Sequence, residues 1–199
     1  MKDFATIING RTLEYLDDEH IYIVDGVIVP SITEILKTRF GKNYNGVSRD
    51  VLRIAAEAGT MVHDAIDNYC KTSEESPIPE LRNFKFLKKK YNFEVEQSEV
   101  PVILTLFNRP IAAGRCDLVL IMSDMVGGAD IKRTSQLDKD YLFYQLNLYR
   151  IAYNQSYGIE WEFLKGIQLK GDKRKFVDIP INEKEAWSLV REYLSASSD

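Results

Sequence analysis

The most constraining feature of this sequence is one stretch of strand-forming residues that carries two aspartates and a lysine. The stretch divides into two predicted strands, Arg115–Met122 and Met125–Lys132, around a tight turn at Ser123 and Asp124. Two apolar strands joined by two polar residues are typical of a β-hairpin. The chain must therefore build a sheet around this hairpin.

In a hairpin with a two-residue turn, Asp117 faces Asp130 and Arg115 faces Lys132. Side chains alternate between the two faces of a strand, so these four polar groups share one face. Like charges in opposed positions are destabilising, and the neighbouring residues are apolar, so we expect a cation between the two acids. Surface exposure of both acids is the alternative interpretation.

Carboxylate oxygens at this spacing suit Mg²⁺ or Mn²⁺. Lys132 lies two residues after Asp130 on the same face, where its ammonium could stabilise negative charge that develops on phosphorus. A simple salt bridge to one of the acids is the alternative for Lys132. Arg115 suits either a phosphate or a structural ion pair.

Composition bounds the class of protein. The chain has 199 residues, of which 45% are hydrophobic, enough for one domain with a core. No apolar run could span a membrane, and the first residues resemble a strand rather than a signal or transit peptide. The net charge of −4 argues against a general nucleic-acid coat. Two local basic clusters leave a basic groove open, although solvated surface is the plainer interpretation: Arg82 with Lys85, Lys88, Lys89 and Lys90, and Lys170 with Lys173, Arg174 and Lys175.

The first part of the chain predicts a hairpin and two helices. Asp25 and Gly26 form a strong two-residue turn, and Ser31 with Glu34 forms a capping box that opens a short helix. The apolar spacing over Ser48–Cys70 predicts a long helix. Its apolar stripe should face the core and consists of Leu52, Ala55, Gly59, Val62, Ile66 and Tyr69.

The remaining elements alternate between helices and strands. In order they are a helix at 80–91, a strand around Glu99, a turn at Asn108, Arg109 and Pro110, the aspartate hairpin, a helix at Lys139–Tyr157, strands at Phe163–Lys170 and Lys175–Ile181, and a last helix that Asn182 and Glu185 cap. An order of helix, three strands, helix and strand predicts an α/β fold. No linker or repeat divides the chain, so we predict a single domain.

Further candidate site residues lie on the two long helices and on the strand before the hairpin. His63 lies four residues after Gly59 at the edge of the apolar stripe, and a structural histidine is the alternative. Glu99 is a third acid that could reach the site or remain on the surface. Gln145 and Tyr149 are four residues apart and share one helix face. A polar rim beside a core tyrosine is their alternative.

Five segments in this order resemble the RecB-like branch of the PD-(D/E)XK nuclease superfamily: GTMVH, SEVPV, AGRCDLVLI, ADIKRT and QLNLY. The preceding VPSITEIL is similar to a segment of phage exonucleases and of the mitochondrial genome maintenance exonuclease. The resemblance implies a restriction-endonuclease-like core, in which helices flank a central mixed sheet in the order α-β-β-β-α-β. We expect one nuclease domain over 1–199, with the N-terminal hairpin extension and short helix at 1–47, the core at 48–181 and the last helix and tail at 182–199.

The resemblance also implies roles for single residues. His63, Asp117, Asp130 and the carbonyl of Ile131 would hold one or two Mg²⁺ or Mn²⁺ ions, with Glu99 as a further candidate ligand, and Asp117, Asp130 and Lys132 would be catalytic. Gln145, Tyr149, Arg115, Gly59 and Thr134 would contact DNA or support the site. The four-cysteine clasp of some relatives is absent, so no iron–sulfur cluster is expected; Cys70 and Cys116 should be free thiols.

The expected activity is metal-dependent hydrolysis of DNA. An exonuclease on single-stranded or end-exposed DNA is favoured, in recombination, repair or phage DNA processing, in the cytoplasm of a bacterial or phage-infected cell. DNA is the expected partner, without a membrane, and a recombination or replication protein is a further candidate partner. The alternatives are a structure-specific or restriction-type endonuclease, a non-catalytic DNA-binding recombination accessory protein and a small-nucleotide phosphodiesterase. Aromatic residues near the basic clusters could stack bases, namely Phe40, Tyr44, Phe84 and Tyr91.

Overall fold

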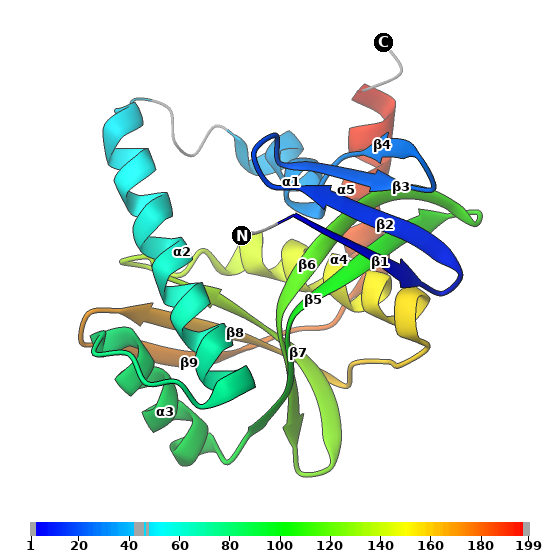
Figure 1. The fold of residues 1–199 in the computed structure, drawn as a ribbon. Coiled ribbons are helices and arrows are strands. Elements are labelled where there is room, and N and C mark those ends of the chain that lie inside the picture. The colour runs from blue at the N-terminus through cyan, green and yellow to red at the C-terminus, as the bar shows by residue number, and fades with distance from the viewer. Residues whose placement is uncertain (1–2, 42–45, 47, 197–199) are drawn as a thin grey trace.

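The chain forms two β-sheets and a set of helices around them (Figure 1), in a computed structural model that describes residues 3–41, 46 and 48–196. The smaller sheet is antiparallel and contains β1 (Phe4–Ile8), β2 (Arg11–Leu16), β3 (Ile21–Val24) and β4 (Val27–Val29). The larger sheet has the strand order β5-β6-β7-β8-β9. The α/β class predicted from the sequence is confirmed.

The N-terminal sheet is larger than predicted. The turn at Asp25 and Gly26 is present, with φ of 51° and 79°, and joins β3 to β4. A second turn of the same kind at Asn9 and Gly10 adds β1 and β2, so the expectation of a hairpin extension was wrong in size. An isolated hairpin is marginally stable. Four strands bury enough apolar surface to pack on the larger sheet, where Ile103 joins their core.

The larger sheet carries the aspartate hairpin in its centre. Its strands are β5 (Glu94–Leu106), β6 (Arg109–Met122), β7 (Met125–Lys132), β8 (Phe163–Lys170) and β9 (Lys173–Ile179). Neighbouring strands are antiparallel except β7 and β8, which are parallel. Parallel neighbours need a crossover, and α4 (Lys139–Tyr157) supplies it. The predicted order of elements is thus observed.

The hairpin register is the one predicted. Met122 pairs with Met125, and Leu118 pairs with Ala129. The turn residues Ser123 and Asp124 both have positive φ, at 49° and 66°, as a type I′ turn requires.

The start of β6 differs from the prediction. The strand begins at Arg109 rather than Arg115, because β6 pairs with β5 over most of its length. The turn between them lies at Phe107 and Asn108, with φ of 48° and 60°, and not at Asn108, Arg109 and Pro110.

Helices cover both faces of the larger sheet. α1 (Ile32–Phe40), α4 and α5 (Glu183–Ala196) pack on one face, where Val119 points. α2 (Arg49–Thr72) and α3 (Pro79–Tyr91) pack on the other, with Leu118 and Leu120. Cys70 and Cys116 are free, as predicted. None of the helices in the described ranges is both long and apolar enough to cross a bilayer.

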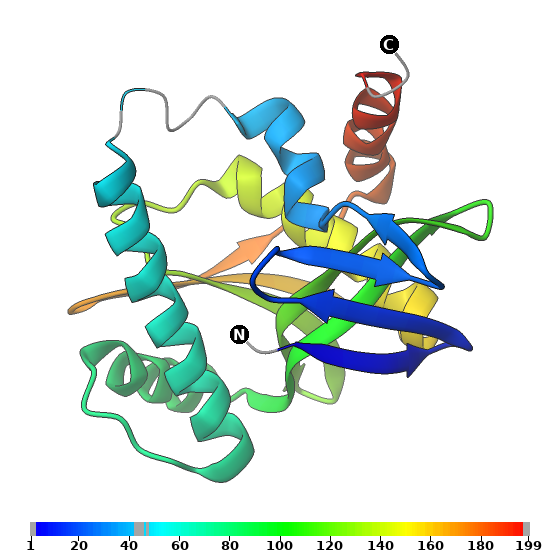
Figure 2. The ribbon, with the colours of Figure 1, turned by 45° about the horizontal axis from the view of Figure 1, so that its top comes forward.

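Only part of the predicted apolar stripe on α2 reaches the core. Val62 and Ile66 are buried, whereas Ala55 is exposed and Leu52 is half-buried. A helix of 24 residues is about 36 Å long, and its first turns stand away from the larger sheet (Figures 1 and 2). The stripe prediction was wrong for this half because periodicity does not show where the underlying sheet ends.

Candidate metal centre

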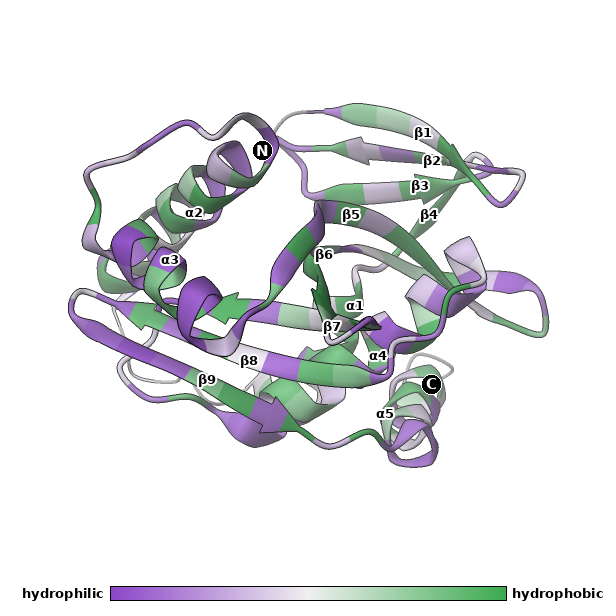
Figure 3. Ribbon diagram, turned by 90° about the horizontal axis from the view of Figure 1, so that it is seen from below, coloured by the Kyte–Doolittle hydropathy of each residue, from purple (hydrophilic) through white to green (hydrophobic). Residues whose placement is uncertain are grey.

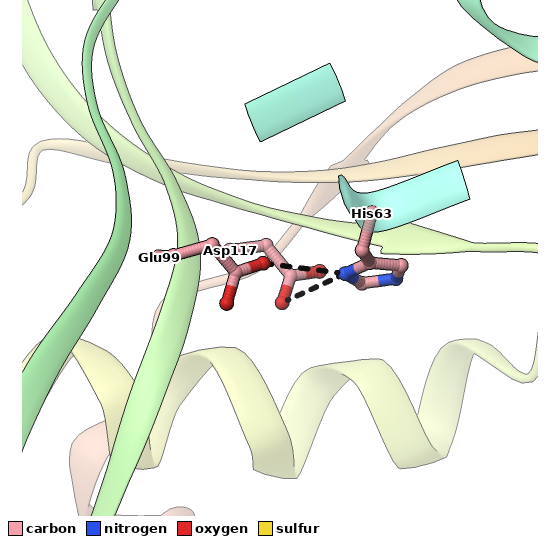
Figure 4. A group of neighbouring side chains, drawn as sticks. All are labelled: His63, Glu99 and Asp117. Atoms are coloured by element: carbon pink, nitrogen blue, oxygen red, sulfur yellow. Dashed lines mark ion pairs between the residues drawn. The ribbon is translucent and has the colours of Figure 1, made fainter. Parts of the chain in front are cut away.

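Three predicted ligands come together where α2 crosses the larger sheet. His63 comes from α2, Glu99 from β5 and Asp117 from β6 (Figure 4). One ligand atom from each lies within 4.8 Å of the others. All three side chains are half-buried, so solvent and a substrate can reach them. Among the described residues, no such group of three includes Asp130.

The orientation of His63 is set by a backbone carbonyl. Its Nε2 lies 3.1 Å from the carbonyl oxygen of Ile131, and a carbonyl only accepts, so Nε2 carries the hydrogen and donates it. Nδ1 therefore faces the carboxylates, 3.6 Å from Glu99 and 3.6 Å from Asp117. A histidine that donates from one nitrogen and presents the other to acids has the arrangement of a metal ligand.

Without a metal, a proton takes the place of the cation at this point. Burial alone would lower the pKa of His63, but the carboxylates of Asp117 and Glu99 outweigh burial and raise that pKa to about 9. At neutral pH the imidazole of the metal-free protein is therefore charged. A divalent ion must displace this proton to bind there.

Asp117 and Asp130 are held separately. The pairing between β6 and β7 ends at Leu118 and Ala129. Beyond that point the amide of Ile131 donates to Asp117 Oδ2 at 2.7 Å, which fixes this carboxylate. Asp130 instead lies 2.7 Å from the ammonium of Lys132. The hairpin therefore brings the two acids to one site with different partners.

Burial and neighbouring charges shift the pKa values of the two aspartates and of Lys132. Burial raises the pKa of Asp130 to about 6, and Asp117 adds to the effect although Lys132 opposes it. Burial also raises the pKa of Asp117. For Lys132, burial would lower the pKa, but Asp130 and Asp117 raise it above its ordinary value. Lys132 is therefore an ammonium, and the carboxylates of Asp117 and Asp130 can bind a further cation.

Arg115 pairs with Glu99 rather than lying opposite Lys132 as predicted. Its Nε is 2.7 Å from Glu99 Oε2. Glu99 itself has a φ of +53°, the left-handed region that non-glycine residues rarely adopt. It sits between the pairs Ser98–Leu118 and Val100–Cys116, opposite Asp117. Residues held in this way cluster at functional sites, and here the unusual backbone accompanies a carboxylate that faces His63.

The predicted supporting residues line one cleft, except Thr134. A cleft of about 1050 Å³ contains the three ligands with Asp130, Lys132, Arg115, Gly59, Gln145 and Tyr149. Gln145 is 4% exposed, and its Oε1 has no hydrogen-bond partner among the described residues. Thr134 is not a lining residue; its carbonyl accepts from Gln168 at 2.7 Å.

Sequence reasoning missed the second wall of the cleft. The N-terminal sheet and the start of α1 contribute Phe4, Tyr15, His20, Tyr22, Ser31 and Thr33. Nothing in the sequence singled out His20, because its place depends on how the small sheet docks on β5 and β6. The only usable signal was one tyrosine in each of β2 and β3, Tyr15 and Tyr22.

The aromatic residues expected to stack bases have other surroundings. Phe84 is fully buried in the core, so that interpretation was wrong for it. Phe40 contacts Tyr141, and Tyr91 contacts Phe176. Tyr44 lies outside the described residues.

Comparisons with known proteins bear on the fold alone. No family model matches the chain, and no curated protein matches it significantly. Solved structures do match, in 19 chains. The crystal structure of SSO0001 is 16% identical, with a TM-score of 0.50 over 84% of this chain and 76% of that chain. This chain therefore has an α/β fold similar to that of SSO0001.

Proposed function

We propose that this chain is a metal-dependent DNA nuclease with a restriction-endonuclease-like core of the RecB-like PD-(D/E)XK type. One observation carries the proposal: an imidazole and two carboxylates converge within 4.8 Å, in the same cleft as a lysine ammonium paired to a third, buried acid. The element order of α2, β5, β6, β7, α4 and β8, with α3 between α2 and β5, agrees with the core that the resemblance implies.

The residues fit a divalent ion. Two carboxylates and an imidazole nitrogen are ligands for Mn²⁺, and Mg²⁺ accepts the same oxygens. Burial raises the pKa values of Asp117 and Asp130, and a divalent ion bound to these carboxylates would favour their charged forms. When bound, such an ion supplies Lewis-acid polarisation of a phosphodiester and of the attacking water.

Lys132 and Arg115 supply the cations of the chain itself. Lys132 is 25% exposed on its side chain and opens on the cleft. Asp130 holds its ammonium, which can donate to a non-bridging phosphate oxygen and stabilise the charge of the transition state. Arg115 is held by Glu99 and can contact a neighbouring phosphate. Gln145 adds a buried amide with a free acceptor beside them.

The substrate that we propose is single-stranded or end-exposed DNA, cut as an exonuclease during recombination, repair or phage DNA processing in a bacterial or phage-infected cytoplasm. A recombination or replication protein is a further proposed partner. The half-buried ligands favour a strand that enters the cleft over a passing duplex. A restriction-type endonuclease and a non-catalytic accessory protein share the fold and remain the alternatives.

The test uses end-labelled linear single-stranded, linear duplex and circular DNA with Mg²⁺, Mn²⁺ or EDTA. We expect metal-dependent loss of linear DNA, at least about a hundredfold slower in Asp117→Asn and in Lys132→Gln. Asp178→Asn is the matched control, because Asp178 is an exposed acid on the same sheet that pairs with Lys165.

Each outcome decides between the candidates. Loss of linear DNA that spares circles supports the exonuclease, and cutting of circles moves the proposal to an endonuclease. Salt-sensitive DNA binding without cleavage in either metal would favour the accessory protein. Equal rates in Asp117→Asn and Asp178→Asn would contradict the site.

A further inference from the structure

Exposed members of the two basic clusters lie on neighbouring elements of the fold. α3 lies beside β9, and the guanidinium of Arg174 on β9 covers the ring of Phe86 on α3. Arg82, Lys89 and Lys90 share the helix face of Phe86, since they lie four residues before it and three and four residues after it. These four residues of α3, with Lys173 and Arg174 of β9, are named the basic face here. All six are exposed. Figure 3 shows hydrophilic stretches on α3 and on the β8–β9 hairpin beside it.

Buried polar side chains hold this surface in one arrangement. Asn83 is 1% exposed, and it donates to the carbonyl of Gly171 at 2.6 Å and accepts from Arg174 at 2.6 Å. Glu80 is 4% exposed and accepts from the amide of Gly171 at 2.9 Å. The β8–β9 turn is therefore fastened to α3. A solvated patch does not need such buried polar contacts, whereas a preorganised binding surface benefits from them.

The charge of the basic face is mostly uncompensated. Among the described residues, Lys89, Lys90 and Lys173 have no acidic partner, and Arg82 approaches only the exposed Asp172, at 3.5 Å. The chain as a whole carries a net charge of −4. Cations gathered on one face of an acidic protein create a local positive potential that attracts polyanions.

An exposed aromatic ring lies within this charge. Phe86 is 46% exposed, and the guanidinium of Arg174 lies 3.9 Å from its ring centre. Basic residues with interleaved aromatic rings are typical of surfaces that bind nucleic acid, because rings and guanidinium planes can stack on bases. An acidic protein partner would match the charge but has no bases to stack on Phe86 and Arg174.

The basic face is connected to the candidate metal centre. Arg133 follows Lys132 directly and lies 3.2 Å from Glu80 at the start of α3. Because β7 and β8 are parallel, their carboxyl ends, at Lys132 and Lys170, lie at the same edge of the sheet. Lys170 is followed by the turn that carries Lys173. DNA that leaves the cleft at this edge would meet the basic face.

We propose that the basic face is a second DNA-binding surface, which holds the phosphate backbone beyond the cleft without a metal. The inference rests on the proposed function for its choice of DNA as the polyanion. The phosphate backbone of the DNA would contact the described residues of α3 and β9, which lie outside the metal centre.

The experiment measures binding of fluorescein-labelled duplex and single-stranded DNA by anisotropy in EDTA, over a series of salt concentrations. The test variant is Lys89→Gln, Lys90→Gln and Lys173→Gln together. The control variant is Lys37→Gln, Lys184→Gln and Arg191→Gln, three exposed cations of α1 and α5, which changes the net charge equally. Thermal unfolding of both verifies their folds.

We expect the test variant to bind DNA more weakly and the slope of log affinity against log salt to fall by about 2 to 3 on duplex. The control should match the wild type. Manganese-dependent hydrolysis of bis(p-nitrophenyl) phosphate should be equal in all three proteins, because this small diester needs only the cleft.

Wild-type affinity and slope in the test variant, or equal loss in both variants, would overturn the inference. Absence of DNA binding by the wild type in EDTA would overturn it too. Weakened DNA binding in the test variant alone supports the basic face, even if no protein hydrolyses the diester; that result would count against the proposed function only.

Discussion

The positive φ of Glu99 predicts which of two substitutions at this position gives the more stable protein. Glu99 has a φ of +53°, which costs a non-glycine residue about 1–2 kcal/mol. Glu99→Ala and Glu99→Gly both remove the carboxylate and its pairing with Arg115, but only glycine removes the backbone strain. Glycine also gives the unfolded chain more freedom, which costs about 0.4–1 kcal/mol of stability. The difference leaves Glu99→Gly more stable than Glu99→Ala by about 0.8 kcal/mol at the middle of these ranges, and by up to about 1.6 kcal/mol.

The same pair of substitutions at Glu96 is the control. Glu96 is exposed on the same strand and is not among the residues with positive φ. There alanine should be more stable than glycine by about 0.5–1 kcal/mol, so the sign reverses between two positions three residues apart.

The assay is urea unfolding of the four variants in EDTA, with thermal unfolding beside it. A difference of 1 kcal/mol corresponds to about 2–4 °C in Tm for a domain of this size. If Glu99→Gly were less stable than Glu99→Ala, as at Glu96, the strain argument would be refuted. Both Glu99 variants should also lose part of the stabilisation by Mn²⁺, whereas the Glu96 variants should keep it.

Two other predictions test the packing and the charge of the site. Gly128→Ala should destabilise the fold by about 1–3 kcal/mol or more in urea unfolding, because its Cβ would lie 2.0 Å from a ring carbon of the buried Trp161. Gly41→Ala, with its Cβ at an ordinary 3.5 Å from Lys37, should be near neutral, and an equal effect at both would contradict the packing argument. Stabilisation by Mn²⁺ should increase with pH. The raised pKa values of His63, about 9, and Asp130, about 6, keep protons on the metal-free site at low pH. The charged His63 stabilises the metal-free fold, fully below its unfolded pKa of about 6.5, and this contribution is lost as the pH rises through about 9. While Asp130 is protonated, the fold avoids the cost of burying a charged carboxylate. This contribution to stability is lost as the pH rises through its pKa of about 6. A Tm gain with Mn²⁺ over EDTA that did not change between about pH 5.5 and pH 9 would refute this reasoning.

The hairpin could be predicted in register because local rules determine it. A two-residue turn and strict alternation leave one pairing that puts the apolar residues of β6 and β7 in the core, and Leu118 and Ala129 pair as that rule requires. His63 could be placed near the sheet by helical periodicity for the same reason. Its contact with the carbonyl of Ile131 could not, because that contact depends on how far α2 lies from β7.

Features that depend on docking between distant segments were not accessible from the sequence. The stripe on α2 gave no sign that its first half would extend beyond the sheet, and His20 gave no sign that it would line the cleft. The positive φ of Glu99 has no local cause either, because glutamate has no preference for that conformation. The strand nevertheless continues its pairing with β6 before and after this residue, at Ser98 and Val100.

The sequence places several acids close together, and in the structure each of them has a different partner. By the hairpin register Asp117 and Asp130 lie opposite each other, but the β6–β7 pairing ends just before them. The amide of Ile131 on β7 donates to Asp117, and the ammonium of Lys132 pairs with Asp130. Glu99 gains Arg115. What remains unbalanced is the point where Glu99 and Asp117 meet His63, and there the metal-free protein holds a proton on the imidazole. Because metal binding must release this proton, we expect a divalent ion to bind where Glu99 and Asp117 meet His63, and to bind there more tightly as the pH rises.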